Sequence, residues 1–138
     1  MQTVMDRGTG GSARWKYKFN RPAAGKTGTT QGWSDAWFVG FTPQIAAGCW
    51  FGVDDFRVPL GPGQDGSIAA LPAWARFMKG AHDTLDFPIQ KFEKPSGIQD
   101  IEICSVTKKA PVPACPVEKE IFKVGTEPIQ KCKVHRTQ

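Results

Sequence analysis

The chain has 138 residues, of which 40% are hydrophobic, and its formal net charge is +5 at pH 7. This length accommodates one modest domain with an apolar core. No stretch reaches the roughly 18 consecutive apolar residues of a transmembrane helix. The basic residues accompany no recognition helix or nucleic-acid-binding motif, so we do not expect nucleic acid as a partner.

Apolar periodicity in the first half of the chain predicts mainly strands. Residues 1–7 fit the end of a helix that stops at Gly8. Trp15, Tyr17 and Phe19 alternate with polar residues, which indicates a short strand. Three further strands are predicted at residues 23–30, 36–42 and 45–53, the last two joined by a short turn. Short links between consecutive strands predict an antiparallel sheet.

The pattern changes in the second half of the chain. Residues 57–66 are rich in glycine and proline and predict a loop, whereas apolar residues recur at helical spacing over residues 67–83. Prolines and spaced cysteines then indicate a small extension at 95–138 after a domain at 1–94. The expected fold class is α+β, an antiparallel sheet with a packed C-terminal helix plus a small Cys-containing tail. We interpret four tryptophans mainly as core residues: Trp33, Trp37, Trp50 and Trp74. Of these, Trp33 is also placed to line a cleft, because it closely follows the strand predicted at residues 23–30.

The triplet Lys26-Thr27-Gly28 lies in the first of the three main strands. A strand with this sequence presents an ammonium group and a hydroxyl group, and the glycine lets a ligand lie close to the backbone. We therefore expect an edge that binds a carboxylate-bearing, peptide-like ligand. A phosphate-binding loop is disfavoured, because the GxxxxGK[ST] pattern requires glycine where the chain has Asn20.

Longer runs around this triplet carry a family resemblance. The runs are Arg21-Pro-Ala-Ala-Gly-Lys-Thr-Gly-Thr-Thr30, Ser34-Asp-Ala-Trp-Phe-Val-Gly-Phe-Thr-Pro43 and Trp50-Phe-Gly-Val-Asp-Asp55. With Met5-Asp-Arg-Gly-Thr-Gly10 upstream and Leu71-Pro-Ala-Trp74 downstream, they resemble the C-terminal part of the transpeptidase domain of class A penicillin-binding proteins. The resemblance implies a fragment of the β-lactamase/transpeptidase-like fold over residues 1–83.

The resemblance also implies a function. Members of this family are serine acyltransferases that cross-link peptidoglycan stem peptides and are acylated by β-lactams at the same serine. It implies that Lys26, Thr27, Gly28 and Thr29 bind the substrate, and that the backbone N–H of Thr29 donates to the oxyanion. The implied partners are stem peptides and β-lactams, and the implied location is the extracytoplasmic face of the bacterial cell membrane.

The other two motifs of the family do not occur where they are expected, before the triplet. SxxK and Ser-x-Asn should precede the triplet, and the SxxK string Ser105-Val-Thr-Lys108 lies downstream in a segment without a helical pattern. We therefore expect a fragment that is inactive alone, needs the upstream half of the transpeptidase domain, and self-associates through its exposed sheet. The alternative is a non-catalytic cell-wall binding or interaction module.

The four cysteines form no CxxC pair, so we expect no zinc site, and no motif indicates a cofactor. Cys104 and Cys115 lie eleven positions apart across two prolines and are predicted to form a disulfide. Cys132 would then have no disulfide partner in this segment. His82 and His135 lack the sequence neighbours of a catalytic pair and are expected to have no catalytic role.

Overall fold

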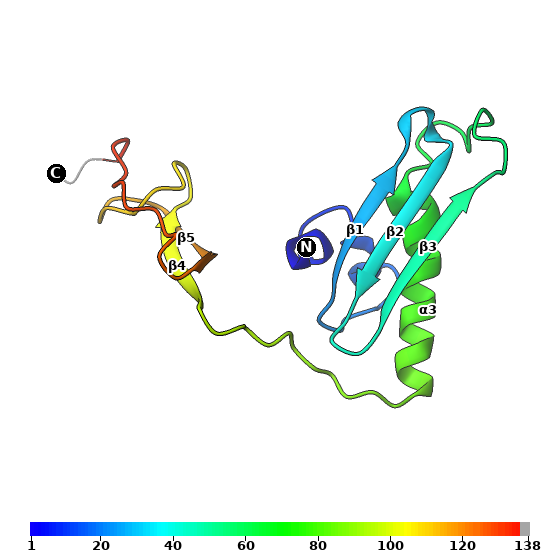
Figure 1. The fold of residues 1–138 in the computed structure, drawn as a ribbon, viewed down its shortest axis with the longest axis horizontal. Coiled ribbons are helices and arrows are strands. Elements are labelled where there is room, and N and C mark those ends of the chain that lie inside the picture. The colour runs from blue at the N-terminus through cyan, green and yellow to red at the C-terminus, as the bar shows by residue number, and fades with distance from the viewer. Residues whose placement is uncertain (136–138) are drawn as a thin grey trace. The chain divides into compact units, whose positions relative to one another are not determined.

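The computed structural model describes residues 1–135, which form two compact units. The first unit is Met1–Phe92 and the second begins at Glu93, two residues before the predicted start of the extension. Each unit has its own sheet (Figure 1). Within residues 1–135, no helix combines the length and the apolar composition needed to cross a membrane.

The first unit contains the predicted antiparallel sheet. Its strands are β1 (Ala24–Thr29), β2 (Asp35–Phe41) and β3 (Ala46–Gly52), in the order β1-β2-β3. The turn between β2 and β3 closes where the N–H of Thr42 donates to the C=O of Ile45 at 2.9 Å. Because β2 is central, β1 and β3 are the two edges of this sheet.

One long helix covers one face of this sheet, as Figure 1 shows. It begins with a π-helical turn, η2 (Gly66–Ala70), and continues as α3 (Leu71–Thr84). The carboxylate of Asp65 caps the start, because its Oδ1 accepts hydrogen bonds from the N–H groups of Ser67 and Ile68 at 2.7 and 3.1 Å. The predicted antiparallel sheet with a packed helix is therefore confirmed.

The core between helix and sheet is centred on Trp74, which is fully buried. Its ring lies 4.9 Å from that of Phe38 and 5.4 Å from that of Phe19, between ring centroids. Its indole N–H donates to the C=O groups of Gly40 and Ala47 at 3.3 and 3.0 Å. One side chain thus joins α3 to both β2 and β3, by packing and by hydrogen bonds.

His82 is also buried at the end of this core. Its Nδ1 lies 2.7 Å from the C=O of Met78, so that nitrogen carries the proton and donates. Its Nε2 then accepts from the hydroxyl of Thr42 at 2.9 Å. Both ring nitrogens are satisfied by core groups, which gives this histidine a structural role.

The segment before the sheet differs from the prediction. It contains two short helices, α1 (Gln2–Asp6) and α2 (Ser12–Trp15), so the predicted strand over Trp15, Tyr17 and Phe19 is wrong. The chain turns after α2 because the Arg14 guanidinium donates to the carbonyl groups of Phe19 and Arg21. Phe19 enters the core, while Trp15 is 68% exposed.

The second unit is built on a two-stranded antiparallel sheet. Strand β4 (Ile98–Cys104) pairs with β5 (Val117–Lys123), with Ile98 opposite Lys123. Among its described residues, the buried apolar side chains are those of Ile103, Cys104 and Cys132. A sheet of two strands is marginal in water by itself, so the long loops around the cysteines are central to this unit.

Candidate functional site

The predicted binding triplet lies on the outer edge of β1. Gly25 donates its N–H to the C=O of Met1, away from the sheet, whereas the N–H of Thr30 turns back to the C=O of Asp35. Backbone groups of an edge strand alternate in direction. The N–H groups of Thr27 and Thr29 are therefore directed outward, to an edge with which no strand pairs within residues 1–135.

The side chains of the triplet divide between the two faces of the sheet. Lys26 and Gly28 pair with Val39 and Trp37, which are exposed on the face opposite α3. Thr27 and Thr29 project to the helix-covered face by the alternation of the strand. The structure thus places the ammonium and hydroxyl groups on either side of one backbone edge.

Local contacts position each of these groups. The ammonium of Lys26 donates to the C=O of Thr27 at 2.8 Å, and the hydroxyl of Thr27 lies 3.2 Å from that of Thr9. The hydroxyl oxygen of Thr29 accepts the N–H of Gly66 at 3.2 Å, which leaves its own O–H available to a ligand. A Cβ atom at Gly66 would lie 2.1 Å from the C=O oxygen of Trp37, so only glycine fits there.

The face of the sheet opposite α3 is rich in exposed aromatic side chains. Trp37 and Trp50 are 45% and 43% exposed, and their ring centroids are 6.3 Å apart. The indole N–H of Trp50 donates to Asp35 at 2.8 Å. Of the four tryptophans interpreted as core residues, only Trp74 is buried, because the alternation of β2 and β3 turns Trp37 and Trp50 outward. Trp33 is 40% exposed.

A pocket of about 530 Å³ in the first unit lies away from this edge. Residues of α1 and α2 and of the segment that leads into β1 line it, and none of Lys26, Thr27, Gly28 and Thr29 does. This pocket therefore does not include the residues of the predicted binding edge.

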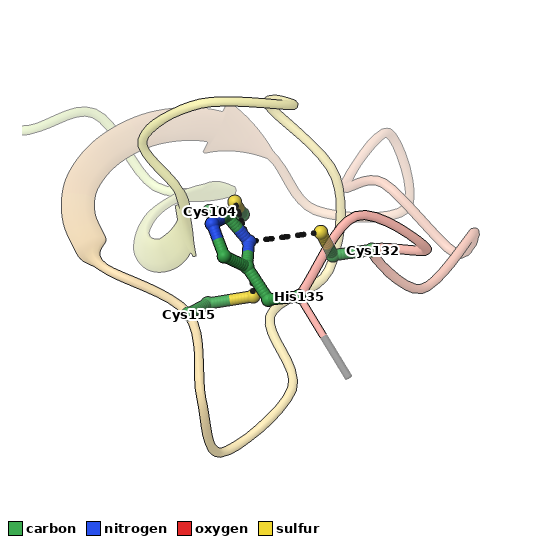
Figure 2. A group of neighbouring side chains, drawn as sticks. All are labelled: Cys104, Cys115, Cys132 and His135. Atoms are coloured by element: carbon green, nitrogen blue, oxygen red, sulfur yellow. Dashed lines mark hydrogen bonds between the residues drawn. The ribbon is translucent and has the colours of Figure 1, made fainter. Parts of the chain in front are cut away.

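The second unit brings four potential ligands together (Figure 2). The Nδ1 atom of His135 lies 3.5 Å from the sulfurs of Cys104 and Cys115 and 3.3 Å from that of Cys132. All four atoms lie within 4.8 Å of one another. The predicted disulfide between Cys104 and Cys115 is not formed, because both thiols are free and face this shared centre.

The surroundings of the cluster lower the pKa of two of its thiols and raise the pKa of the third. The hydroxyl of Thr107 and the backbone of His135 lower the pKa of Cys132 to about 5. Burial opposes ionisation of Cys104, yet hydrogen bonds from Thr107 lower its pKa overall. Burial raises the pKa of Cys115, and contact with Cys132 raises the pKa of His135.

Sequence reasoning missed His135 as a partner of the cysteines. Cys104, Cys115 and Cys132 are widely spaced, so they form no CxxC pair. The signal that was present is Cys132-x-x-His135, in which a mixed pair of ligands has the short spacing typical of metal sites.

The downstream SxxK string has no catalytic geometry. The hydroxyl of Ser105 donates to the C=O of Pro116 at 3.2 Å, and the ammonium of Lys108 forms an ion pair with Glu118. The two residues lie in a turn, where Lys108 has a φ of 57°. An SxxK nucleophile requires the lysine to face the serine from the next turn of a helix, and this turn does not provide that arrangement.

Comparison with known proteins shows one family throughout. The family model described as "Penicillin-binding protein 1A, C-terminal domain" matches residues 94–137. Penicillin-binding protein 1A of Clostridium tetani is 37% identical over 133 residues, and that of Aquifex aeolicus is 38% identical over 122 residues. These alignments cover 92% and 88% of this chain and 16% of each relative.

A solved structure agrees with these sequences. The crystal structure of penicillin-binding protein 1A from Haemophilus influenzae matches with a TM-score of 0.79 at 33% identity, over 91% of this chain and 18% of that chain. The chain is similar to class A penicillin-binding proteins over most of its length. It corresponds to the C-terminal part of their transpeptidase domain, and it spans about one sixth of the length of the curated relatives it matches.

Proposed function

We propose that this chain supplies the KTG strand of the cleft in which a peptidoglycan D,D-transpeptidase binds its substrate. The observation that carries the proposal is the outward edge of β1, where the N–H groups of Thr27 and Thr29 point away from the sheet. An extended stem peptide would add to this edge as a further strand. Its terminal carboxylate would meet the ammonium of Lys26 and the hydroxyls of Thr27 and Thr29.

The reaction of the whole enzyme would be acyl transfer through a serine ester. A serine hydroxyl attacks the carbonyl between two D-alanine residues, the terminal D-alanine leaves with the proton, and an amine of a second stem peptide then displaces the serine. The N–H of Thr29 would stabilise the negative oxygen of each tetrahedral intermediate. A β-lactam would acylate the same serine. The site of action would be the extracytoplasmic face of the bacterial cell membrane.

The isolated chain should not be acylated, because Ser105 and Lys108 are engaged by other groups. The nucleophile and its base would come from the upstream half of the transpeptidase domain. Incubation of the chain with a penicillin should leave its intact mass unchanged. A stoichiometric adduct on Ser105 would contradict this assignment.

Substitution of Lys26 tests the binding role in a full-length class A enzyme that carries this chain as its C-terminal part. Lys26→Ala should slow acylation by a fluorescent penicillin by roughly 10²-fold, the scale of losing one transition-state contact. Lys79→Ala is the matched control, because Lys79 is an exposed lysine on α3 that pairs with Asp83. Equal acylation rates for both variants would reject the proposed role of Lys26.

A second role, as a non-catalytic interaction module, is favoured by the compact second unit and its own family model. Removal of the residues after Lys94 from the same full-length enzyme separates the two roles. Loss of cross-linking with intact penicillin acylation would assign partner binding to this unit. Loss of acylation would assign it to the transpeptidase site.

A further inference from the structure

We propose that Cys104, Cys115, Cys132 and His135 form a structural zinc site in the second unit. The four ligand atoms come from the end of β4, from the loop before β5 and from the segment after β5. They therefore join the three parts of this unit at one point, as Figure 2 shows.

The distances match tetrahedral coordination. With zinc–sulfur bonds of about 2.3 Å and a zinc–nitrogen bond of about 2.0 Å, a tetrahedron separates nitrogen from sulfur by roughly 3.5 Å and sulfur from sulfur by roughly 3.8 Å. The three separations between Nδ1 of His135 and the sulfurs are 3.5, 3.5 and 3.3 Å. All four ligand atoms lie within 4.8 Å of one another, so a single ion at the centre of the cluster is within reach of all four.

Hydrogen bonding does not account for this arrangement. An imidazole nitrogen has either one N–H or one lone pair in the ring plane, so it serves one partner well. Here three sulfurs converge on the single Nδ1 atom of His135. A disulfide would join only two of the three cysteines and would need a sulfur–sulfur separation of about 2.05 Å. A shared cation uses all four groups at once.

The ligand set selects the metal and its role. Three thiolates and one imidazole in tetrahedral geometry are typical of zinc. Four ligands from the chain leave no open position for water or substrate, which is the arrangement of a structural site and not of a catalytic one. Binding would release the protons that the thiols still carry, and the resulting centre would carry a net charge of −1.

Groups around the cluster are placed to support thiolates. The N–H of Val112 donates to the sulfur of Cys115 at 3.3 Å. The hydroxyl oxygen of Thr107 is buried beside Cys104 and Cys132. A thiolate bound to zinc would accept this hydroxyl and complete the outer shell of the site.

The second unit has few other means to hold its fold. Its large apolar side chains are mostly exposed, including Ile121 at 57% and Ile129 at 91%. The segment that carries Cys132 is held by a short parallel bridge between Ala110 and Lys131, beside which the N–H of Cys132 donates to the C=O of Ala110 at 2.8 Å. Small units with such cores usually depend on a metal or on disulfides.

Cobalt binding by the reduced full chain tests the proposal, since Co²⁺ in a tetrahedral thiolate site gives intense visible bands and sulfur-to-metal charge-transfer absorption. We expect one Co²⁺ per chain, displaced by one Zn²⁺. Cys132→Ser should weaken binding by more than the roughly 10–100-fold that loss of an outer-shell partner costs. Cys49→Ser is the matched control, because Cys49 lies in β3 of the first unit, and it should bind like the original chain.

His135→Cys is a second variant that distinguishes loss of a metal ligand from failure of the chain to fold. It replaces the nitrogen ligand with a fourth thiolate, so it should keep the one-to-one stoichiometry and increase the charge-transfer absorption, whereas His135→Ala should weaken binding. The proposal is overturned if the reduced chain binds neither cobalt nor zinc, or if the bands lack thiolate character. Equal loss of binding in Cys49→Ser, or a chain that holds a Cys104–Cys115 disulfide under reducing conditions, would overturn it as well.

Discussion

Each of the two units of this chain is stabilised in a different way. The first unit buries a contiguous core between a sheet and a helix, with Trp74, Phe38 and Phe19 in mutual contact. The second unit leaves most of its apolar side chains in solvent and concentrates its buried contacts on cysteines. Hydrophobic burial therefore specifies the first fold, whereas the second depends on the chemistry of a few side chains.

The largest expected effect in the first unit comes from its central side chain. Trp74→Ala removes packing on two strands and two indole hydrogen bonds, and should lower the free energy of unfolding by about 3–5 kcal/mol. Phe77→Ala on the same helix is the control, because Phe77 is 56% exposed. Urea unfolding followed by tryptophan fluorescence measures both. If the two variants were equally destabilised, the core would not be the main support of this unit.

A smaller effect is expected at Gly66, where the start of η2 lies close to the backbone of β2. Gly66→Ala places a methyl group against the C=O of Trp37 and should cost about 1–3 kcal/mol. Gly80→Ala is its counterpart, since Gly80 lies in α3 with open space around its Cα and should gain up to about 1 kcal/mol. Opposite shifts in the urea midpoint are predicted. In both variants, cobalt binding by the second unit should be unchanged.

The smallest effect concerns the helix cap. Asp65→Ala should cost about 1 kcal/mol, because the helix start loses its acceptor. The hydroxyl of Ser67 holds the pKa of Asp65 below its ordinary value. The carboxylate therefore stabilises the fold above the ordinary pKa, and this contribution is lost as pH falls through the lowered value.

Asp65→Asn checks this pH dependence. Asparagine caps nearly as well as aspartate, so stability near pH 7 should change little, while part of the loss of stability below about pH 4 should disappear. Asp54→Asn, at an exposed position, should keep the original pH profile. An unchanged profile for Asp65→Asn would contradict the capping argument.

The sequence predicted the parts of the fold that repeat a regular pattern. Alternation located β2 and β3, and helical spacing located α3, because one face of each element meets the same core. Alternation also misled at Trp15, Tyr17 and Phe19, where hydrogen bonds from Arg14 turn the chain and no partner strand exists within residues 1–135. Alternation over so few residues does not show whether a partner strand is present.

The two candidate sites differ in how far apart their residues lie in the sequence. The KTG triplet is a continuous stretch, so the sequence predicted its strand, although not the division of its side chains between two faces. The cysteine cluster joins residues 104, 115, 132 and 135 across two loops, and only the fold brings them together. Local spacing revealed one of its pairs, Cys132-x-x-His135.

Hydrogen exchange of the reduced full chain, with and without one equivalent of Zn²⁺, tests most directly whether the two units are stabilised differently. We predict that amides of β1 to β3 and α3 are protected equally in both samples, because their core needs no metal. Amides of β4, β5 and the loops that carry the cysteines should become protected only with zinc. Equal protection of the second unit without metal, or zinc-dependent protection of the first, would contradict the account.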